Sequence, residues 1–225
     1  MNNLVFLPGA SGNTQFWNPL IAQLPKSYTK QIIHYPDFHG VAAHPDINSF
    51  DDLTDYVVAQ IQQPSILIAQ SMGGIFAIAA TLQKTDLVKG LVLMATSGGI
   101  NLDPFQVQDW RQAYQQEYLQ YPDWFITAKV DYEAELADIQ QQVLLLWGDQ
   151  DLISPVTVGQ HLQHIFKKSE LYVIQYGEHD FAEQYADEVA IYINAFIKQF
   201  YGAECADSFT TTFHVVKRAD DSKSV

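Results

Sequence analysis

The stretch "LIAQSMGGIFAIAA", residues 67–80, decides the fold, because an aliphatic run passes in it almost directly into a segment of helical character. Residues 69–73 read Ala-Gln-Ser-Met-Gly, a variant of the pattern G-x-S-x-G, in which a serine lies on a sharp turn between a strand and a helix. The chain passes close to such a serine on both sides, so the residues two before and two after it must be small. Gly73 meets this condition and Ala69 adds one methyl group. Ser71 is therefore either a reactive serine on a turn or the N-cap of an ordinary helix.

Short apolar runs and longer segments of helical period alternate on both sides of this stretch. The strand candidates are residues 4–7, 31–35, 65–69, 90–95, 143–147 and 170–176, and the helix candidates are residues 14–24, 49–62, 73–83, 155–166 and 183–200. Continuous runs of Val, Ile and Leu are typical of strands that are buried on both faces. The alternation predicts an α/β fold with a mostly parallel sheet of about six strands and helices on both faces.

The spacing of these elements predicts one domain over residues 1–200. Residues 98–139 are too long for a simple crossover between two strands, and they read as a small helical cap with helical spacing at Trp110, Tyr114 and Tyr118. Residues 201–225 lose the helical period, so we expect a C-terminal tail that is partly disordered or pairs as an edge strand.

Composition excludes several classes of partner. The 225 residues include 26 acidic and 12 basic side chains, for a formal charge of −14, which argues against nucleic acid and anionic membrane surfaces. Cys205 is the single cysteine, so an intramolecular disulfide is not expected. The N-terminal sequence does not resemble a signal peptide, and no apolar run approaches the roughly 20 residues that span a bilayer. These features predict a cytoplasmic protein.

Two later loops supply the partners that a reactive serine needs. "WGDQD" follows a predicted strand and contains Asp149 and Asp151, and "YGEHD" follows the next one and contains His179. Either loop alone would read as an ordinary polar turn. Together they give the order Ser71, Asp151, His179, with the acid and the histidine at later strand ends, which is the order of a nucleophile, an orienting acid and a general base. We prefer Asp151 because it lies deeper in the turn, whereas Asp149 suits a role in capping it.

The glycine turn "PGASG", residues 8–12, follows the first predicted strand. A backbone amide in such a turn can face the serine and stabilise an oxyanion, and the amides of Ala10 and Met72 are the candidates. Dinucleotide binding is the competing interpretation of the turn. It fails because Gly9 and Gly12 are three residues apart, which is not the spacing of G-x-G-x-x-G.

The remaining histidines point to no further chemistry. His34, His39 and His44 lie in a loop rich in Pro and Gly without a second cluster of ligands, so a metal site is not expected there. His161 and His164 lie three residues apart on a predicted helix, and we expect them on the surface. No cofactor and no metal are predicted.

The motifs "LPGASG", "AQSMGG", "WGDQD" and "YGEHD" together resemble the α/β-hydrolase fold superfamily over residues 3–200. The resemblance is greatest to small carboxylesterases of the pimeloyl-carrier-protein methyl ester esterase type. It implies a minimal member of the fold, because the sequence begins at what would be the third strand and lacks the first hairpin. Two further departures are Pro8-Gly9 where many members have His-Gly, and Ala69 in place of glycine. None of these departures removes a catalytic group.

The predicted function is that of a serine hydrolase that cleaves a small or medium acyl carboxylester through a Ser-His-Asp acyl-enzyme mechanism. The cap has enough aromatic surface to wall an acyl pocket, in Phe105, Trp110, Tyr114, Tyr118, Tyr121, Trp124 and Phe125. Of these we expect Phe105, Trp110, Tyr114 and Trp124 to line the pocket. A small cap predicts a shallow pocket.

Three alternatives stay open at this point. The same site could cleave thioesters. A lyase of the hydroxynitrile type uses the same triad with a lysine near the pocket, for which Lys129 is the one cap lysine. A noncatalytic binding module could also retain the fold. An acidic carrier protein is a poor partner, because Arg111 and Lys129 are the only basic residues of the cap.

Overall fold

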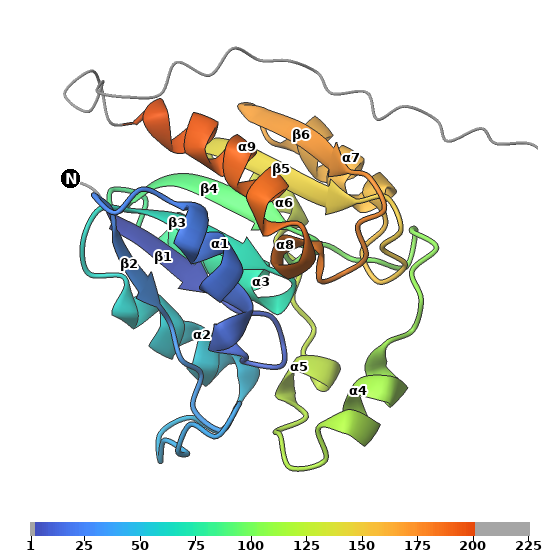
Figure 1. Ribbon diagram of the computed structural model, residues 1–225. Coiled ribbons are helices and arrows are strands. Elements are labelled where there is room, and N and C mark those ends of the chain that lie inside the picture. Colours follow the sequence, from blue (N-terminus) through green and yellow to red (C-terminus); the bar gives the residue numbers. More distant parts are fainter. Residues whose placement is uncertain (1–2, 201–225) are drawn as a thin grey trace, which may run out of the picture.

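The computed structural model describes residues 3–200, so the predicted C-terminal tail at 201–225 lies outside the described residues. A six-stranded sheet runs through the described part in the order β2-β1-β3-β4-β5-β6, and every neighbouring pair is parallel (Figure 1). The strands are β1 (Asn3–Leu7), β2 (Thr29–Ile32), β3 (Ser65–Gln70), β4 (Val88–Met94), β5 (Gln142–Gly148) and β6 (Ser169–Ile174). The predicted parallel sheet is confirmed.

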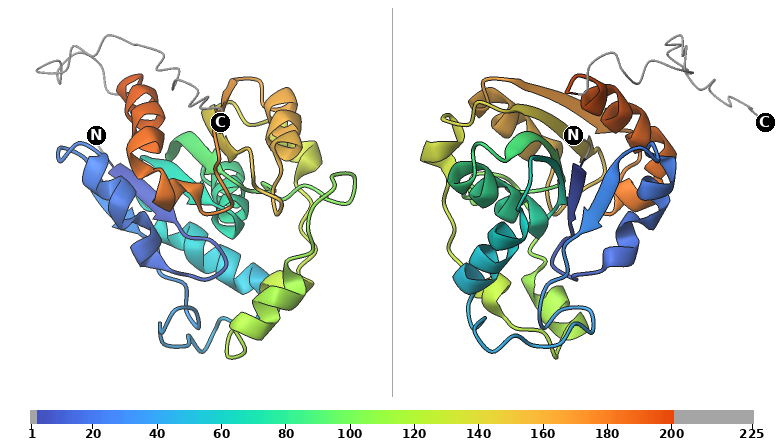
Figure 2. Two further views of the ribbon diagram at one scale, coloured as in Figure 1. Left: turned by 45° about the vertical axis from the view of Figure 1, so that its right-hand side comes forward. Right: turned by 90° about the vertical axis from the view of Figure 1, so that its left-hand side faces the viewer.

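Helices cover both faces of this sheet, as predicted (Figure 2). Helices α2 (Phe50–Gln60), α3 (Met72–Gln83) and α7 (Val156–Ile165) pack on one face, and α1 (Asn18–Gln23), α8 (Phe181–Gln184) and α9 (Ala186–Lys198) pack on the other. A short 3-10 helix, Thr14–Trp17, precedes α1.

The two cores follow from the alternation of side chains along each strand. In β1, Val5 and Leu7 face the α2–α3–α7 layer, whereas Leu4 and Phe6 face the α1–α8–α9 layer. Residues of β3, β4 and β5 divide in the same way. This two-sided burial is why the strands read as continuous apolar runs rather than alternating ones.

Three predicted boundaries were wrong. The second strand ends at Ile32 rather than 35, because the chain leaves the ladder after Ile33 and the buried Tyr35 ring turns beneath the end of β1. The sixth strand ends at Ile174, since Tyr176 takes a left-handed conformation with φ of 61°. The predicted helix over residues 183–200 is two helices, α8 and α9, that break at Tyr185.

The cap segment connects β4 to β5. Its first two helices lie apart from the sheet layers, whereas its third packs against the core through Leu136 (Figures 1 and 2). It contains three short helices, α4 (Arg111–Glu117), α5 (Trp124–Thr127) and α6 (Glu133–Leu136). Most of α4 is exposed, but Tyr114 is 9% exposed and points back into the protein. Among residues 3–200, no helix has both the length and the apolar character needed to cross a bilayer.

Candidate active site

Ser71 occupies the turn between β3 and α3 in a strained conformation, with φ of 53° and ψ of −122°. It holds the N-cap position of α3, yet its side chain makes no capping hydrogen bond. Two contacts to β4 and its following turn hold the backbone there. The Ser71 amide donates to the Met94 carbonyl at 3.0 Å, and the Thr96 hydroxyl donates to the Ser71 carbonyl at 2.6 Å. The fold therefore leaves the serine hydroxyl available for another partner.

Close backbone packing explains the small residues around Ser71. A Cβ atom at Gly73 would overlap the carbonyl oxygens of Leu7 and Pro8, which are backbone atoms of the neighbouring strand end. Ala69 is fully buried, and the site accommodates its methyl group. The turn thus requires glycine two residues after the serine, at Gly73, but tolerates alanine two residues before it, at Ala69.

The hydroxyl of Ser71 faces His179 from the loop after β6. Ser71 Oγ lies 3.1 Å from His179 Nε2, and His179 Nδ1 lies 2.8 Å from Asp151 Oδ2. The Asp151 side chain is 0% exposed and the His179 side chain 25% exposed. With Nδ1 donating to the carboxylate, Nε2 is left to accept the serine proton.

Asp151 rather than Asp149 contacts the histidine. Its other oxygen, Oδ1, accepts hydrogen bonds from the amides of Ile153 at 2.8 Å and Ser154 at 2.9 Å. Asp149 is exposed, and its amide continues the ladder toward the Ile174 carbonyl at 3.2 Å. The turn therefore holds one carboxylate oxygen of Asp151, and His179 contacts the other oxygen. This arrangement holds the imidazole in a single orientation.

The amides predicted to bind an oxyanion lie at the same place. Ala10, Met72, Ser71 and His179 all line one cavity. Within residues 3–200, neither the Ala10 amide nor the Met72 amide has a hydrogen-bond acceptor. Both donors are consequently available to a bound group, and Met72 is also the first residue of a helix, whose N-terminal dipole favours negative charge.

The cavity above Ser71 has a volume of about 850 Å³, so it is larger than the shallow pocket predicted. Trp110 and Tyr114 line it, as expected. Phe105 and Trp124 do not. Phe105 packs against His161 with ring centroids 5.3 Å apart, and Trp124 packs toward Phe38 at 6.3 Å. Both rings pack against the core and so hold the cap to it.

Sequence reasoning missed part of the aromatic wall. Phe125 stacks between Trp110 at 4.8 Å and Phe50 at 5.9 Å, and all three rings line the cavity. The helical segment that suggested Trp124 also contains Phe125, so the correct residue was one position away. Phe50 comes from α2 and gave no such signal. The three rings form a continuous apolar surface from the cap to the core.

Gln70 is a further residue that the sequence analysis did not name. It precedes Ser71, lines the cavity and donates from Nε2 to the His179 carbonyl at 3.2 Å. This bond connects the elbow directly to the histidine loop. Its position next to the serine was the only signal available.

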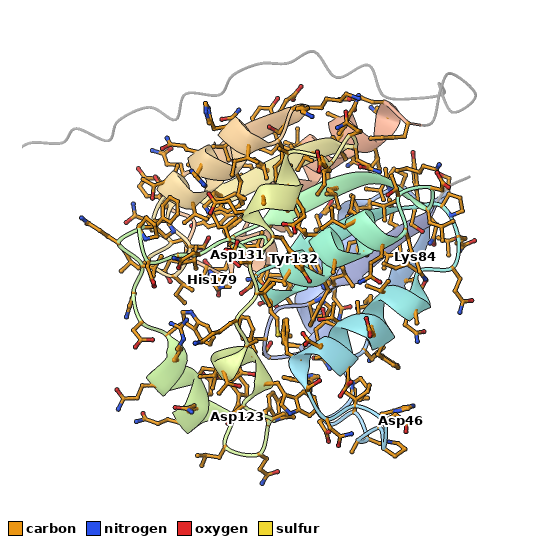
Figure 3. The ribbon with its side chains drawn as sticks, turned by 180° about the vertical axis from the view of Figure 1, so that it is seen from behind. Asp46, Lys84, Asp123, Asp131, Tyr132 and His179 are labelled. Atoms are coloured by element: carbon orange, nitrogen blue, oxygen red, sulfur yellow. The ribbon has the colours of Figure 1, made fainter. Side chains whose placement is uncertain are left out.

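Charged side chains also line the cavity. Arg111 and Lys129 are the basic ones, and the acidic ones are Asp103, Glu117, Asp131 and Asp180. Asp131 and His179, both labelled in Figure 3, belong to this lining. The cavity lining therefore carries more acidic than basic side chains.

The other histidines lie outside this cavity. In the described range 3–200, no group of three or more His, Cys, Asp or Glu side chains could hold a metal ion. His161 and His164, which we expected on the surface, are both accessible: His164 is exposed, and the His161 side chain is 35% exposed and lies 2.7 Å from Glu133 of α6.

Comparisons with known proteins bear on the family and the fold of the chain. The profile of the Alpha/beta hydrolase family matches residues 4–128. A provisional 2-succinyl-6-hydroxy-2,4-cyclohexadiene-1-carboxylate synthase of Haemophilus influenzae is 26% identical over 179 residues, which cover 75% of this chain and 64% of that protein. A pimeloyl-[acyl-carrier protein] methyl ester esterase of Shewanella woodyi is 34% identical over 95 residues, 42% of this chain and 36% of that protein. The chain thus spans less than two thirds of either relative.

Solved structures share the fold. A lipase-esterase related protein of Clostridium acetobutylicum has a TM-score of 0.72 and 20% identity, over 87% of this chain and 94% of that one.

Proposed function

Because this chain belongs to the alpha/beta hydrolase family, we propose that it is a serine hydrolase that cleaves carboxylesters. The observation that carries the proposal is the continuous contact from Ser71 Oγ to His179 at 3.1 Å and from His179 to the buried Asp151 at 2.8 Å. A serine that served only as a helix cap would need neither partner. The strained turn and the absence of a capping bond support the same conclusion.

In the proposed mechanism, Ser71 Oγ attacks the ester carbonyl carbon while His179 Nε2 accepts the hydroxyl proton. The carbonyl oxygen becomes an oxyanion, to which the Ala10 and Met72 amides donate. Collapse of the tetrahedral intermediate breaks the bond to the alkoxy oxygen, and His179 returns the proton to it, so that an alcohol leaves. Water then attacks the acyl-enzyme with His179 again as base, which releases the acid and restores Ser71. Asp151 orients the imidazole throughout.

The acyl group we propose is apolar and of medium length. A cavity of about 850 Å³ is at the upper end of the range of small-ligand sites, and the stacked rings of Trp110, Phe125 and Phe50 give it an apolar wall. An acetyl group would leave most of that wall without contact. Thioesters with the same acyl group fit the same site, because the oxyanion and the proton transfer are alike.

A small-molecule ester suits the cavity better than an ester on an acidic carrier protein. The esterase of Shewanella woodyi is named for a carrier-protein substrate. Here the formal charge is −14, and four acidic groups but only two basic ones line the cavity. An acidic partner would be repelled at this face.

A second candidate is a lyase or synthase reaction on a carboxylate-bearing substrate. The relative from Haemophilus influenzae is named as a carboxylate synthase. Arg111 and Lys129 both line the cavity and could pair with a substrate carboxylate. In that reaction Ser71 and His179 would move a proton without forming an acyl-enzyme.

Labelling and ester hydrolysis test the two candidates. We expect a fluorophosphonate to label Ser71 in the native protein, and p-nitrophenyl esters from acetate to decanoate to give the highest kcat/KM at medium chain length. Ser71→Ala should abolish both, and Thr157→Ala on the exposed face of α7 provides a matched control. Activity that survives in Ser71→Ala would refute the mechanism. Labelling without ester turnover would favour the second candidate.

A further inference from the structure

The turn that carries the Ala10 amide has three consecutive carbonyls, and each accepts a different hydrogen bond. The Pro8 carbonyl accepts from the Tyr35 hydroxyl at 2.9 Å, and the Gly9 carbonyl accepts from the Gly12 amide at 3.0 Å. The Ala10 carbonyl accepts from the Tyr114 hydroxyl at 2.7 Å. The first donor belongs to the core, the second to the turn itself, and the third to helix α4 of the cap.

These bonds bear on the direction of the Ala10 amide. That N–H belongs to the peptide unit between Gly9 and Ala10, and the units on either side of it carry the Pro8 and Ala10 carbonyls. The carbonyl of that same unit, Gly9, is held from within the turn by the Gly12 amide, and the two neighbouring units are held by side chains from outside the turn. Tyr35 fixes the preceding unit and Tyr114 fixes the following one.

The surroundings of Tyr114 favour its hydrogen bond to the Ala10 carbonyl. It is 9% exposed on a helix whose other residues are mostly exposed, and its ring packs against Trp110 at 5.7 Å and Tyr118 at 4.9 Å. Burial raises the pKa of Tyr114, with smaller contributions from nearby tyrosines, so the hydroxyl stays protonated as a donor. Tyr114 and Ala10 are 104 positions apart in the sequence, so this hydrogen bond joins the cap to the core.

We propose that Tyr114 is a positioning residue that fixes the Ala10 peptide for oxyanion binding. The catalytic step then depends on the position of helix α4 of the cap relative to the core. The inference rests on the proposed function. Tyr114 both lines the cavity and donates to the Ala10 carbonyl. An acyl group that packs against α4 should therefore also hold the Ala10 amide in position to donate to the oxyanion.

The test compares two hydroxyl deletions in the cap. Tyr114→Phe removes the bond to Ala10 and keeps the ring in the wall. Tyr121→Phe is the matched control, because its hydroxyl also joins cap to core, accepting from the His39 amide at 2.9 Å, but lies outside the cavity and away from the turn. For each protein we would measure kcat and KM with one medium-chain ester, the rate of fluorophosphonate labelling, and inhibition by a trifluoromethyl ketone, whose adduct with Ser71 bears an oxyanion.

In Tyr114→Phe we expect kcat to fall about tenfold with KM nearly unchanged, and the inhibition constant of the ketone to rise by a similar factor. Tyr121→Phe should stay within about twofold of the native protein. Equal kcat in the native protein and Tyr114→Phe, a rise in KM alone, or an equal fall in Tyr121→Phe would each overturn the role of Tyr114 while the native protein still reacted. If no labelling occurred in any of the three, the proposed function itself would fail, and this inference with it.

Discussion

Replacing Asp151 with asparagine tests the site most directly, because the change exchanges one oxygen for an NH2 group of the same size. Asp151 Oδ1 accepts from two amides and Oδ2 accepts from His179. In Asp151→Asn the amide oxygen takes the place of Oδ1, which leaves the NH2 group facing His179 Nδ1. That nitrogen must then accept, so the ring proton moves to Nε2 and His179 loses its ability to take the proton of Ser71.

The structure gives separate magnitudes for activity and stability. The wrong tautomer should lower kcat/KM by a factor on the order of 10⁴. The two bonds from the backbone amides survive and the bond to His179 is kept with its direction reversed, so we expect the free energy of unfolding to fall by only about 1–2 kcal/mol. Asp151→Ala would remove all three and leave two backbone amides buried without partners, at a cost of about 2–6 kcal/mol.

The assay is ester hydrolysis for activity and urea unfolding, followed by tryptophan fluorescence, for stability. Asp149→Asn is the control, since that side chain is exposed and touches none of the catalytic groups; its kcat/KM should stay within about twofold of the native value. If Asp151→Asn kept more than about a tenth of the native kcat/KM, the orienting role assigned to Asp151 would be refuted. An equal loss in Asp149→Asn would refute the choice between the two acids.

Further substitutions probe the elbow, the acyl wall and the core tyrosine. Gly73→Ala sets a methyl group against the carbonyl oxygens of Leu7 and Pro8, so urea unfolding should report a loss of about 1–3 kcal/mol together with lost activity; unchanged stability would contradict the close approach. Trp110→Ala removes part of the cavity wall, and we expect kcat/KM to fall about tenfold more for an octanoate than for an acetate ester. An equal fall for both esters would exclude the ring from the acyl pocket. Burial raises the pKa of Tyr35 well above 10.0, so above that pH the folded state holds a proton that the unfolded chain releases, and the native free energy of unfolding decreases. Tyr35→Phe should show a shallower decrease in alkaline unfolding experiments, and an identical slope would count against a buried hydroxyl.

Most of the fold was predictable because two-sided burial leaves a strong mark in sequence. The central strands β1, β3, β4 and β5 are almost wholly buried between the two helical layers, so each appeared as a short apolar run, and the helices between them kept their period. One predicted strand boundary was wrong because an apolar side chain has a role outside the strand. Tyr35 looked like part of a strand, but its ring is buried and its hydroxyl donates to the Pro8 carbonyl in the turn at residues 8–12.

The candidate site was predictable where chain order carried the information. Ser71, Asp151 and His179 follow β3, β5 and β6, and parallel strands bring their ends to one edge of the sheet. The cavity wall was less predictable because it depends on how the cap folds onto the core. Helical spacing on α4 identified Trp110 and Tyr114, whereas Phe50 contributes from a distant helix and Phe105 turns away.

The contact between Ser71 and His179 joins residues 108 positions apart, and it also has a consequence for folding. β4 and β5 pair only after the loop that contains the cap has closed, which costs chain entropy before any pairing energy is gained. β6, which carries the histidine loop, can pair only with a β5 already in place. After dilution from urea, the rate at which Ser71 regains reactivity should therefore report the assembly of strands β3 to β6. We expect it to be slower than the first recovery of the helical circular dichroism signal.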